Sequence, residues 1–476
     1  MLFRQWSHQP RRSQQHPPGG SNVLSRNIFR EYDIRGVTGK DLTPDVARSV
    51  GRAYAAFLDA RNIKGRVAVG RDNRPSGTAL HSELVAGLLE SGVDVVDIGI
   101  IPTPLAYWAQ HNLDIVGGIQ ITGSHNPPEF NGFKLGIGKR SIYGDDIQRI
   151  YELAVAGKFP SGKGTLSSDE IIDRYVEDVG ARIGAISTPI RCIADCGNGA
   201  GALVADKLFK RIGVPVRILF GESDGTFPNH HPDPTVPENL KDLIKAVSDD
   251  EANLGIAFDG DADRIGLVDE DGQIIWGDQI LIIYARDVLG RTGEGQSIIF
   301  DVKCSQALPE EIEKAGGVPV MWKTGHSLIE EKMHETKAPI AGEMSGHMFF
   351  AEGWYGFDDA LYGAARLLRI IADTGKSIKQ MMSDVPRFVS TPELRVDCAD
   401  EKKFGVVAAA QKHFAAEHDV IEVDGVRVLF GDGWGLIRAS NTQPVLVMRF
   451  EARTQAHLDS IREEMEEWLR QQGVAV

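Results

Sequence analysis

The sequence predicts a multidomain α/β protein in which three α/β domains are followed by a smaller α+β domain. Three observations lead to this prediction. The 476 residues are too many for one hydrophobic core, and the usual domain size corresponds to roughly three or four domains. Short apolar runs followed by helical patterns recur along the chain. After Phe388 the pattern changes to alternating apolar and polar residues, which is typical of antiparallel strands.

The expected strands of the α/β domains are short apolar runs, each followed by a helical pattern. They cover residues 67–69, 93–98, 193–194, 254–258 and 297–300. Gly-rich or acidic turns follow many of these strands, as at 70–73, 196–199, 259–261 and 301–303. Ligands bind beyond the carboxyl ends of the strands in open α/β sheets, so we expect these turns to face a binding site.

The C-terminal part should form a separate, smaller domain. Its expected strands cover 394–396, 425–430, 435–438 and 446–450, and a helix is expected near 455–470. The changes of pattern along the chain predict domains over 28–170, 171–275, 276–387 and 388–476.

The charge of the chain excludes two classes of partner. Hydrophobic residues make up 42% of the chain and charged residues 25%, as in an ordinary globular protein. The formal net charge of -15 argues against binding to nucleic acid or to an anionic membrane, because both attract positive patches. No apolar stretch is long enough to span a bilayer, and no signal-peptide pattern opens the chain. We therefore expect a soluble cytoplasmic protein that is a monomer or a weak homo-oligomer.

The cysteines and the N-terminal segment bear on the cellular compartment. The cysteines show no CxxC or His-paired pattern, which indicates buried thiols in a reducing compartment; they are Cys192, Cys196, Cys304 and Cys398. Residues 1–27 contain no acidic residue and are rich in Arg, Gln, Ser and Pro, which predicts a disordered N-terminal tail. An organellar transit peptide is the alternative, although the segment lacks a clear amphipathic face.

The first informative motif is TGSHNPPEFNGFK, which spans residues 122–134. The glycine before Ser124 permits a tight turn, and the two prolines after it stiffen the loop, so the hydroxyl can be held rigidly. A serine is a weak nucleophile unless a base or a charge activates it, and Lys134 and His125 are near enough in sequence to do so. Taken alone, the segment could equally be a surface turn rich in proline and asparagine.

The second motif, DGDADR at residues 259–264, directly follows an apolar strand. Carboxylates at alternate positions of one turn, here Asp259, Asp261 and Asp263, can converge on one hard cation and leave room for a phosphate oxygen. An EF-hand calcium loop is a competing interpretation, but a strand precedes the acidic run where an EF-hand has a helix. A merely solvated acidic turn would not account for the arginine, Arg264, that closes the motif.

Two further motifs present polar groups suited to a sugar phosphate. GEMSGH at 342–347 offers the carboxylate of Glu343, the hydroxyl of Ser345 and the imidazole of His347, with KTGHS at 323–327 upstream. RASNTQP at 438–444 combines a guanidinium, hydroxyls and an amide in the manner of a phosphate-binding nest. A lone histidine is more often structural, and the second segment alone would be an ordinary polar turn.

The four motifs together indicate phosphosugar transfer. A hydroxyl carrier, a cation site, a sugar-gripping loop and a phosphate nest are the parts that this chemistry needs, and each lies in a different predicted domain. We therefore expect an enzyme with Ser124 as the phosphoryl carrier.

The motifs, and their order, resemble those of the α-D-phosphohexomutase superfamily, and the resemblance runs from Phe29 to the C-terminus. FREYDIRG at 29–36 is similar to the family's opening motif, and GEMSGH resembles the phosphomannomutase/phosphoglucomutase type. The resemblance implies three α/β domains with mixed sheets and a fourth α+β domain around a central cleft.

The resemblance also implies roles for individual residues. Ser124 would carry the phosphoryl group, and its phosphate would hold Mg²⁺ together with Asp259, Asp261 and Asp263. Substrate-binding positions would be Tyr32, Arg264, Lys303, His326, Glu343, Ser345, His347, Arg438, Ser440, Asn441 and Thr442. The proton-transfer group stays open among Lys134, His347 and Arg35.

The implied reaction interconverts hexose 1-phosphate and hexose 6-phosphate of mannose, glucose or both. The intermediate would be a hexose 1,6-bisphosphate, and glucose 1,6-bisphosphate would serve as activator. A phosphoglucosamine mutase is the nearest alternative. A sugar-phosphate phosphatase and a non-catalytic sugar-phosphate binding protein are more distant ones.

Overall fold

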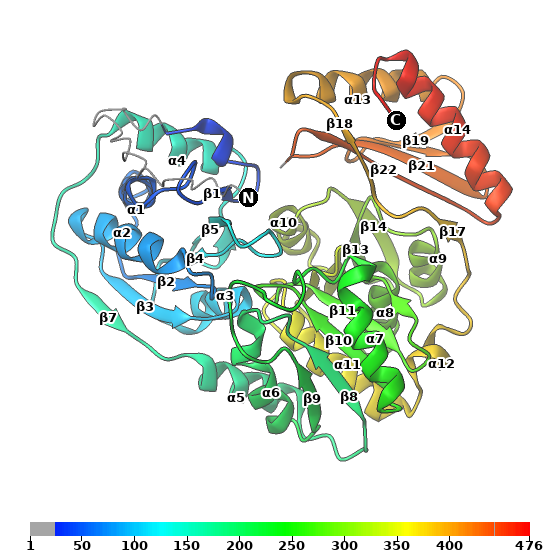
Figure 1. Cartoon of the computed structure of the whole chain (residues 1–476), viewed down its shortest axis with the longest axis horizontal. Coiled ribbons are helices and arrows are strands. Elements are labelled where there is room, and N and C mark those ends of the chain that lie inside the picture. The colour runs from blue at the N-terminus through cyan, green and yellow to red at the C-terminus, as the bar shows by residue number, and fades with distance from the viewer. Residues whose placement is uncertain (1–23, 442) are drawn as a thin grey trace, which may run out of the picture.

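A computed structural model describes residues 24–441 and 443–476 of the chain. Within these residues the strands form four sheets, and Figure 1 shows the corresponding units following one another from the blue N-terminal part to the red C-terminal part. The predicted order of three α/β domains with mixed sheets and a final α+β domain is confirmed. Residues 1–23 of the predicted tail, and Thr442, lie outside the described part. The domain boundaries stay a prediction.

The first domain has a mixed sheet with the order β1-β5-β4-β2-β3-β7, and β6 pairs with β5. Helix α1 begins where Thr43 accepts a hydrogen bond from the amide of Val46 and Pro44 occupies the first turn, where its missing N–H costs nothing. The elements are η1 (Arg26–Ile28), β1 (Ile34–Val37), α1 (Pro44–Asp59), β2 (Val67–Arg71), α2 (Gly77–Glu90), β3 (Val95–Ile100), α3 (Thr103–Asn112), β4 (Gly117–Ile121), β5 (Phe130–Ile137), β6 (Arg140–Ser141), α4 (Asp145–Ala156) and β7 (Leu166–Ser168).

The second domain has a mixed sheet with the order β12-β11-β10-β8-β9. Strand β10 is buried along its whole length, as its uninterrupted apolar sequence predicts, and it pairs with β8 in parallel and with β11 antiparallel. The elements are α5 (Ile172–Ile183), β8 (Cys192–Asp195), η2 (Ala200–Leu203), α6 (Ala205–Arg211), β9 (Val216–Leu219), η3 (Pro237–Leu240), α7 (Lys241–Asp249), β10 (Leu254–Phe258), β11 (Ile265–Asp269) and β12 (Ile274–Ile275).

The third domain repeats this arrangement with the sheet order β14-β13-β15-β16. The side chain of Asp359 accepts a hydrogen bond from the amide of Tyr362 and so caps helix α11. The elements are α8 (Gly277–Thr292), β13 (Ser297–Asp301), α9 (Ala307–Lys314), β14 (Val318–Trp322), α10 (His326–Thr336), β15 (Ile340–Gly342), β16 (Met348–Phe350), α11 (Ala360–Thr374) and α12 (Ile378–Met382).

The fourth domain has an antiparallel sheet with the order β17-β22-β21-β20-β19, and β18 also pairs with β22. Helices α13 and α14 share one hydrophobic core with this sheet, in which Phe414, Met448 and Met465 are buried. The elements are β17 (Val389–Ser390), β18 (Leu394–Asp397), α13 (Asp400–Phe414), β19 (Asp419–Ile421), β20 (Val426–Leu429), β21 (Gly433–Ala439), β22 (Val445–Ala452) and α14 (Gln455–Gln471).

Each of the four sequence motifs occupies a turn between two antiparallel strands. The turns join β4 to β5, β10 to β11, β15 to β16 and β21 to β22. Of the turns expected to face a binding site, the one at 259–261 coincides with a motif, and it directly follows the buried strand β10. The chain then returns along the same sheet rather than entering a crossover helix, which fixes both ends of every turn by main-chain hydrogen bonds.

The first three domains also share a core. Leu105 and Trp108 of α3 belong to the same buried cluster as residues of α5, α6, α8 and α11. The indole Nε1 of Trp108 donates to Asp178 at 2.9 Å, which ties the first domain to α5. This shared packing holds the first three turns in fixed relative positions.

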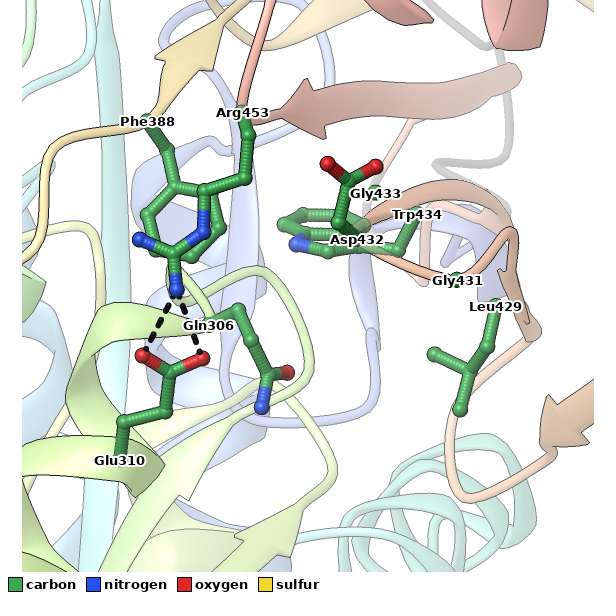
Figure 2. A pocket seen from close by; sticks show the side chains of 9 residues that line it. All are labelled: Gln306, Glu310, Phe388, Leu429, Gly431, Asp432, Gly433, Trp434 and Arg453. Carbon is green, nitrogen blue, oxygen red and sulfur yellow. Dashed lines mark hydrogen bonds and ion pairs between the residues drawn. The ribbon is translucent and has the colours of Figure 1, made fainter.

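The fourth domain attaches to the third through buried arginines. Arg427 donates to the carbonyl oxygens of Val302 and Cys304 at 2.9 and 2.7 Å and stacks on Trp434 with 3.6 Å to the ring centroid. Beside this contact lies a cavity of about 260 Å³, in which Figure 2 shows Arg453 over the ring of Phe388 and paired with Glu310. The lining is completed by Gln306, Leu429, Gly431, Asp432, Gly433 and Trp434.

Replacing Trp434 by alanine should destabilise the attachment of the fourth domain by about 3–5 kcal/mol, because the ring is buried beneath Arg427 and its Nε1 donates to Glu451. Calorimetry and urea unfolding would measure the change. The matched control is Phe404→Ala, since that aromatic ring is 57% exposed on α13 and its loss should change stability by about 0.5 kcal/mol or less. Equal effects of the two substitutions would contradict the prediction.

Candidate active site

Direct contacts bring the turns of all four domains together. The hydroxyl of Ser124 donates to Asp259 at 3.0 Å, which joins the first domain to the second. Arg264 and His347 form a backbone bridge between the second domain and the third. The side chain of Asn441 from the fourth domain donates to the hydroxyl of Tyr32 in the first at 2.8 Å. The motifs that lie far apart in the sequence therefore meet in one place.

Ser124 sits at a strained position of the β4–β5 turn. Its φ of 50° lies in the left-handed region, which a non-glycine residue rarely adopts without surrounding support. The residue is buried, its amide donates to the hydroxyl of Thr122, and its own hydroxyl also lies 3.1 Å from Nδ1 of His125. The hydroxyl of Ser124 is thus held in one direction, toward the acidic turn.

Arg74 supplies much of the support for this turn, and the sequence analysis did not identify it. Its buried guanidinium donates to the carbonyl oxygens of Ser124 and Asn126 at 2.7 and 2.6 Å, and also to those of Pro127 and Phe130. Asp72 pairs with Arg74 at 3.1 Å. The available signal was its position directly after residues 70–73, a turn already expected to face a binding site.

The acidic turn places three fully buried carboxylates together. The ligand atoms of Asp259, Asp261 and Asp263 lie within 4.8 Å of one another. Asp261 accepts hydrogen bonds from Thr103 and Thr122 through Oδ2, whereas Oδ1 of Asp261 and Oδ1 of Asp263 are buried without a hydrogen-bond partner in the part of the chain that the structure describes. A buried carboxylate oxygen normally has a partner, so these two atoms fit a site that can hold a metal ion. Hard oxygen ligands suit Mg²⁺.

Position 260 within this turn requires a glycine for a steric reason. A Cβ atom there would come within 2.4 Å of the carbonyl oxygen of Ser124. Only glycine allows the acidic turn to approach the serine turn this closely.

The neighbouring charges shift the pKa values of two of the buried carboxylates in opposite directions. Burial and the neighbouring carboxylates of Asp263 and Asp261 raise the pKa of Asp259 well above its usual range. Burial would also raise the pKa of Asp263, but Lys134 and His347 outweigh it and hold that pKa well below. Lys134 pairs with Asp263 and Asp261, and these carboxylates raise its pKa although burial opposes them.

The β15–β16 turn brings Glu343, Ser345 and His347 together as the sequence predicts. Nδ1 of His347 lies 2.9 Å from Oε2 of Glu343 and 2.9 Å from the hydroxyl of Ser345. Its Nε2 faces the second domain, 3.3 Å from Nε of Arg264 and 3.4 Å from Asp263. Burial works against the charged ring, but Asp263 in particular raises the pKa of His347 to about 10. The turn can therefore present a charged imidazole beside the acidic turn.

Tyr32 links three domains through its hydroxyl. It donates to the carbonyl oxygen of Thr324 at 2.6 Å and accepts from Asn441. His326 lies at the start of α10 with its ring 6.1 Å from that of Tyr32 and 6.0 Å from that of His347. Arg35 pairs with Asp33 at 2.5 Å and donates to Asn126 of the serine turn at 3.0 Å. The predicted residues of the first and third domains thus lie around one centre.

The remaining predicted residues lie toward the fourth domain. Lys303 pairs with Glu393 at 3.2 Å, and Arg438 donates to Asp424 at 3.0 Å. The hydroxyl of Ser440 accepts from the amide of Gln443, and Lys403 donates to the carbonyl oxygen of Ser440. Thr442, predicted in the same turn, lies outside the described residues. The turn is therefore tied down by Lys403, a second residue that the sequence analysis did not identify.

Family models match the chain in four consecutive parts. They describe phosphoglucomutase/phosphomannomutase alpha/beta/alpha domain I over residues 26–160, domain II over 173–272, domain III over 276–388, and the C-terminal domain over 393–467. The chain belongs to the phosphoglucomutase/phosphomannomutase family. The resemblance seen in the motifs is thereby confirmed.

Relatives in this family match over nearly the full chain. A phosphomannomutase/phosphoglucomutase of Pseudomonas aeruginosa is 46% identical over 441 residues, which cover 92% of this chain and 95% of that protein. A phosphoglucomutase of Neisseria gonorrhoeae is 44% identical over 444 residues, 92% of this chain and 96% of that protein. The crystal structure of a phosphoglucomutase/phosphomannomutase family protein from Burkholderia thailandensis has a TM-score of 0.88 and 45% identity, covering 94% and 98% of the two chains. None of the helices in the described part has the length and apolarity needed to cross a membrane.

The Glu393–Lys303 pair should make the free energy of unfolding fall as the pH drops below about 4.5. Lys303 above all, with Arg395, lowers the pKa of Glu393 from 4.5 to about 2 although burial opposes them. A lowered folded-state pKa contributes stability that is present above pH 4.5 and is lost as the pH falls toward 2. Urea unfolding at pH 3, 5 and 7 should therefore find Glu393→Gln less stable than the wild type by up to about 3 kcal/mol at pH 7 and by less at pH 3.

The exposed Glu422→Gln serves as the matched control and should show no such dependence. A Glu393→Gln deficit that is the same at all three pH values would contradict the assigned ion pair.

Proposed function

We propose that the protein is a phosphohexomutase that interconverts hexose 1-phosphate and hexose 6-phosphate of mannose, glucose or both. The single observation that carries this proposal is the Ser124 hydroxyl, buried and directed at Asp259 of a turn with three carboxylates. Membership of the phosphoglucomutase/phosphomannomutase family supports the same reaction class. The names of the relatives from P. aeruginosa and N. gonorrhoeae support mannose and glucose as the sugars.

The proposed reaction moves one phosphoryl group in each of two steps. Phospho-Ser124 transfers its phosphoryl group to the free hydroxyl of the bound hexose phosphate: the Oγ–P bond breaks, a new O–P bond forms, and the hydroxyl proton passes to a protein group. The resulting hexose 1,6-bisphosphate turns around and returns its other phosphoryl group to Ser124. Charge on the moving group is neutralised by nearby cationic side chains, among them Lys134 and Arg264.

We assign the metal role to Asp259, Asp261 and Asp263 together with the phosphate on Ser124. Oδ1 of Asp261 and Oδ1 of Asp263, which are buried and accept no hydrogen bond from the described residues, support this assignment. Mg²⁺ bound there would supply a positive charge for the transferring phosphoryl oxygens. Lys134 remains on the other oxygen of Asp263 and keeps that carboxylate ionised.

We assign roles in substrate binding to the other predicted residues from their positions around the site. Glu343 and Ser345 are proposed to grip the sugar hydroxyls beside His347, and Tyr32, Lys303 and His326 to line the binding space. Arg438, Ser440, Asn441 and Thr442 are proposed to hold the non-transferring phosphate. For proton transfer the candidates remain Lys134, His347 and Arg35. The raised pKa values of Lys134 and His347 favour proton donation to the departing oxygen of Ser124.

We further propose glucose 1,6-bisphosphate as the compound that loads Ser124, because a bisphosphate can phosphorylate the free serine and leave as a monophosphate. We propose a cytoplasmic enzyme that is a monomer or a weak homo-oligomer. The four cysteines, all free and buried, suit a reducing compartment.

Ser124→Ala should lower the turnover of mannose 1-phosphate and glucose 1-phosphate at least about 10³-fold, because it removes the group that carries the phosphoryl. The assay contains Mg²⁺ and a trace of glucose 1,6-bisphosphate. Ser168→Ala, an exposed serine of β7, is the matched control and should retain full activity.

The same assay separates the alternatives. Preferred turnover of glucosamine 1-phosphate would identify a phosphoglucosamine mutase, and release of inorganic phosphate without a bisphosphate requirement would identify a phosphatase. A folded, phosphorylated wild type that converts none of the three sugars would overturn the proposed function.

Removal of divalent cations by EDTA should abolish turnover, and Mg²⁺ should restore it. Asp261→Asn should raise the Mg²⁺ concentration needed for half-maximal activity at least about tenfold, because it removes one charged ligand oxygen. Asp242→Asn, on the exposed face of α7, should leave the requirement unchanged. Full activity of the wild type in excess EDTA would exclude a catalytic role for the acidic turn as a metal site.

A further inference from the structure

Asp358 is a buried carboxylate that none of the sequence motifs contains. It precedes the capping residue of α11 and is only 2% exposed. Its Oδ2 atom has no hydrogen-bond partner within the described residues. An unpartnered carboxylate oxygen in the interior is costly unless a cation or a proton compensates it, so this atom calls for an explanation.

Two carboxylate oxygens that lack a hydrogen-bond partner among the described residues lie within ion-pair distance of one imidazole nitrogen. Nε2 of His347 lies 3.4 Å from Oδ1 of Asp263 and 3.7 Å from Oδ2 of Asp358. The ligand atoms of the three residues lie within 4.8 Å of one another, and all three side chains are buried. A tetrahedral ion with bonds of about 2.0–2.1 Å separates its ligand atoms by about 3.3 Å, so only small adjustments would close the set around a metal.

The other ring nitrogen, Nδ1, contacts a carboxylate, as is common for histidines that bind metals. Nδ1 faces Oε2 of Glu343 at 2.9 Å, so the carboxylate orients the ring and leaves Nε2 for the second partner. Arg264 also approaches Nε2, at 3.3 Å, and its guanidinium has to turn away for a metal to enter. The two carboxylates of Asp263 and Asp358 nevertheless favour positive charge at Nε2, whether a proton or a metal ion supplies it.

We propose that His347, Asp263 and Asp358 form a second cation site that takes a transition-metal ion such as Zn²⁺ in preference to Mg²⁺. A nitrogen ligand with two carboxylates is a set that Zn²⁺ and Co²⁺ accept readily, whereas Mg²⁺ favours oxygen ligands alone. Asp263 belongs to this set and to the three-carboxylate turn. An ion in the second site therefore competes for a ligand of the first, immobilises His347 and inhibits the enzyme.

Titration of the full chain with Co²⁺ tests the site directly. A tetrahedral N/O site gives Co²⁺ much stronger visible absorption than an oxygen-only site of higher coordination number. We expect this absorption in the wild type and in Asp259→Asn, which weakens only the three-carboxylate turn. We expect its loss in Asp358→Asn, together with at least about tenfold weaker Zn²⁺ binding in equilibrium dialysis. Equal absorption and Zn²⁺ affinity in the wild type and Asp358→Asn would overturn the proposal.

A second variant and an inhibition assay test the same site independently. His347→Gln removes the nitrogen ligand and should abolish the strong absorption even if Asp358→Asn fails to fold; persistence of the absorption would again overturn the proposal. The inhibition rests on the proposed function: Zn²⁺ should inhibit mutase turnover at concentrations at least about tenfold lower in the wild type than in Asp358→Asn. Should the wild type lack mutase activity, the proposed function fails, while the Co²⁺ absorption still decides whether the site exists.

Discussion

The burial of three carboxylates in one six-residue turn is the constraint on which the rest of the site depends. Asp259, Asp261 and Asp263 are all fully buried. Taking one unpaired carboxylate out of water is strongly unfavourable, and three in contact repel one another as well. The threonine hydroxyls at Asp261, the ammonium group of Lys134 and the imidazole of His347 all compensate this charge. They come from two other domains, so the charge balance itself requires the domains to meet.

The use of hairpin turns explains how four domains can deliver groups to one place. A turn that joins antiparallel strands is fixed at both ends by main-chain hydrogen bonds, and its tip extends beyond the sheet edge. The close approach of Gly260 to Ser124, and the backbone bridge from Arg264 to His347, show how little space separates these tips. The first three domains are also joined by a common core that contains Trp108 and neighbouring helices.

The sequence sufficed to predict the order of the domains and the residues of the four turns, because short apolar strands and charged turns are local patterns. It could not reveal that the first three turns also connect antiparallel strands, since pairing is decided by residues far apart in the chain. Arg74 could not be predicted for the same reason. Its guanidinium binds four carbonyl oxygens, and every residue has such an oxygen, so no sequence pattern marks these contacts. Asp358 lies outside every motif, and its relation to His347 exists only in three dimensions.

The hydroxyl of Tyr32, shared between the carbonyl oxygen of Thr324 and the side-chain amide of Asn441, joins three domains through two hydrogen bonds. Each such hydrogen bond contributes about 1 kcal/mol net, so breaking both costs only about 2 kcal/mol. A form in which this hydroxyl has let go of both partners is then populated at roughly a few per cent. The contact that joins the first, third and fourth domains at this hydroxyl therefore opens at a cost that is small against the roughly 5–15 kcal/mol that keeps a typical domain folded.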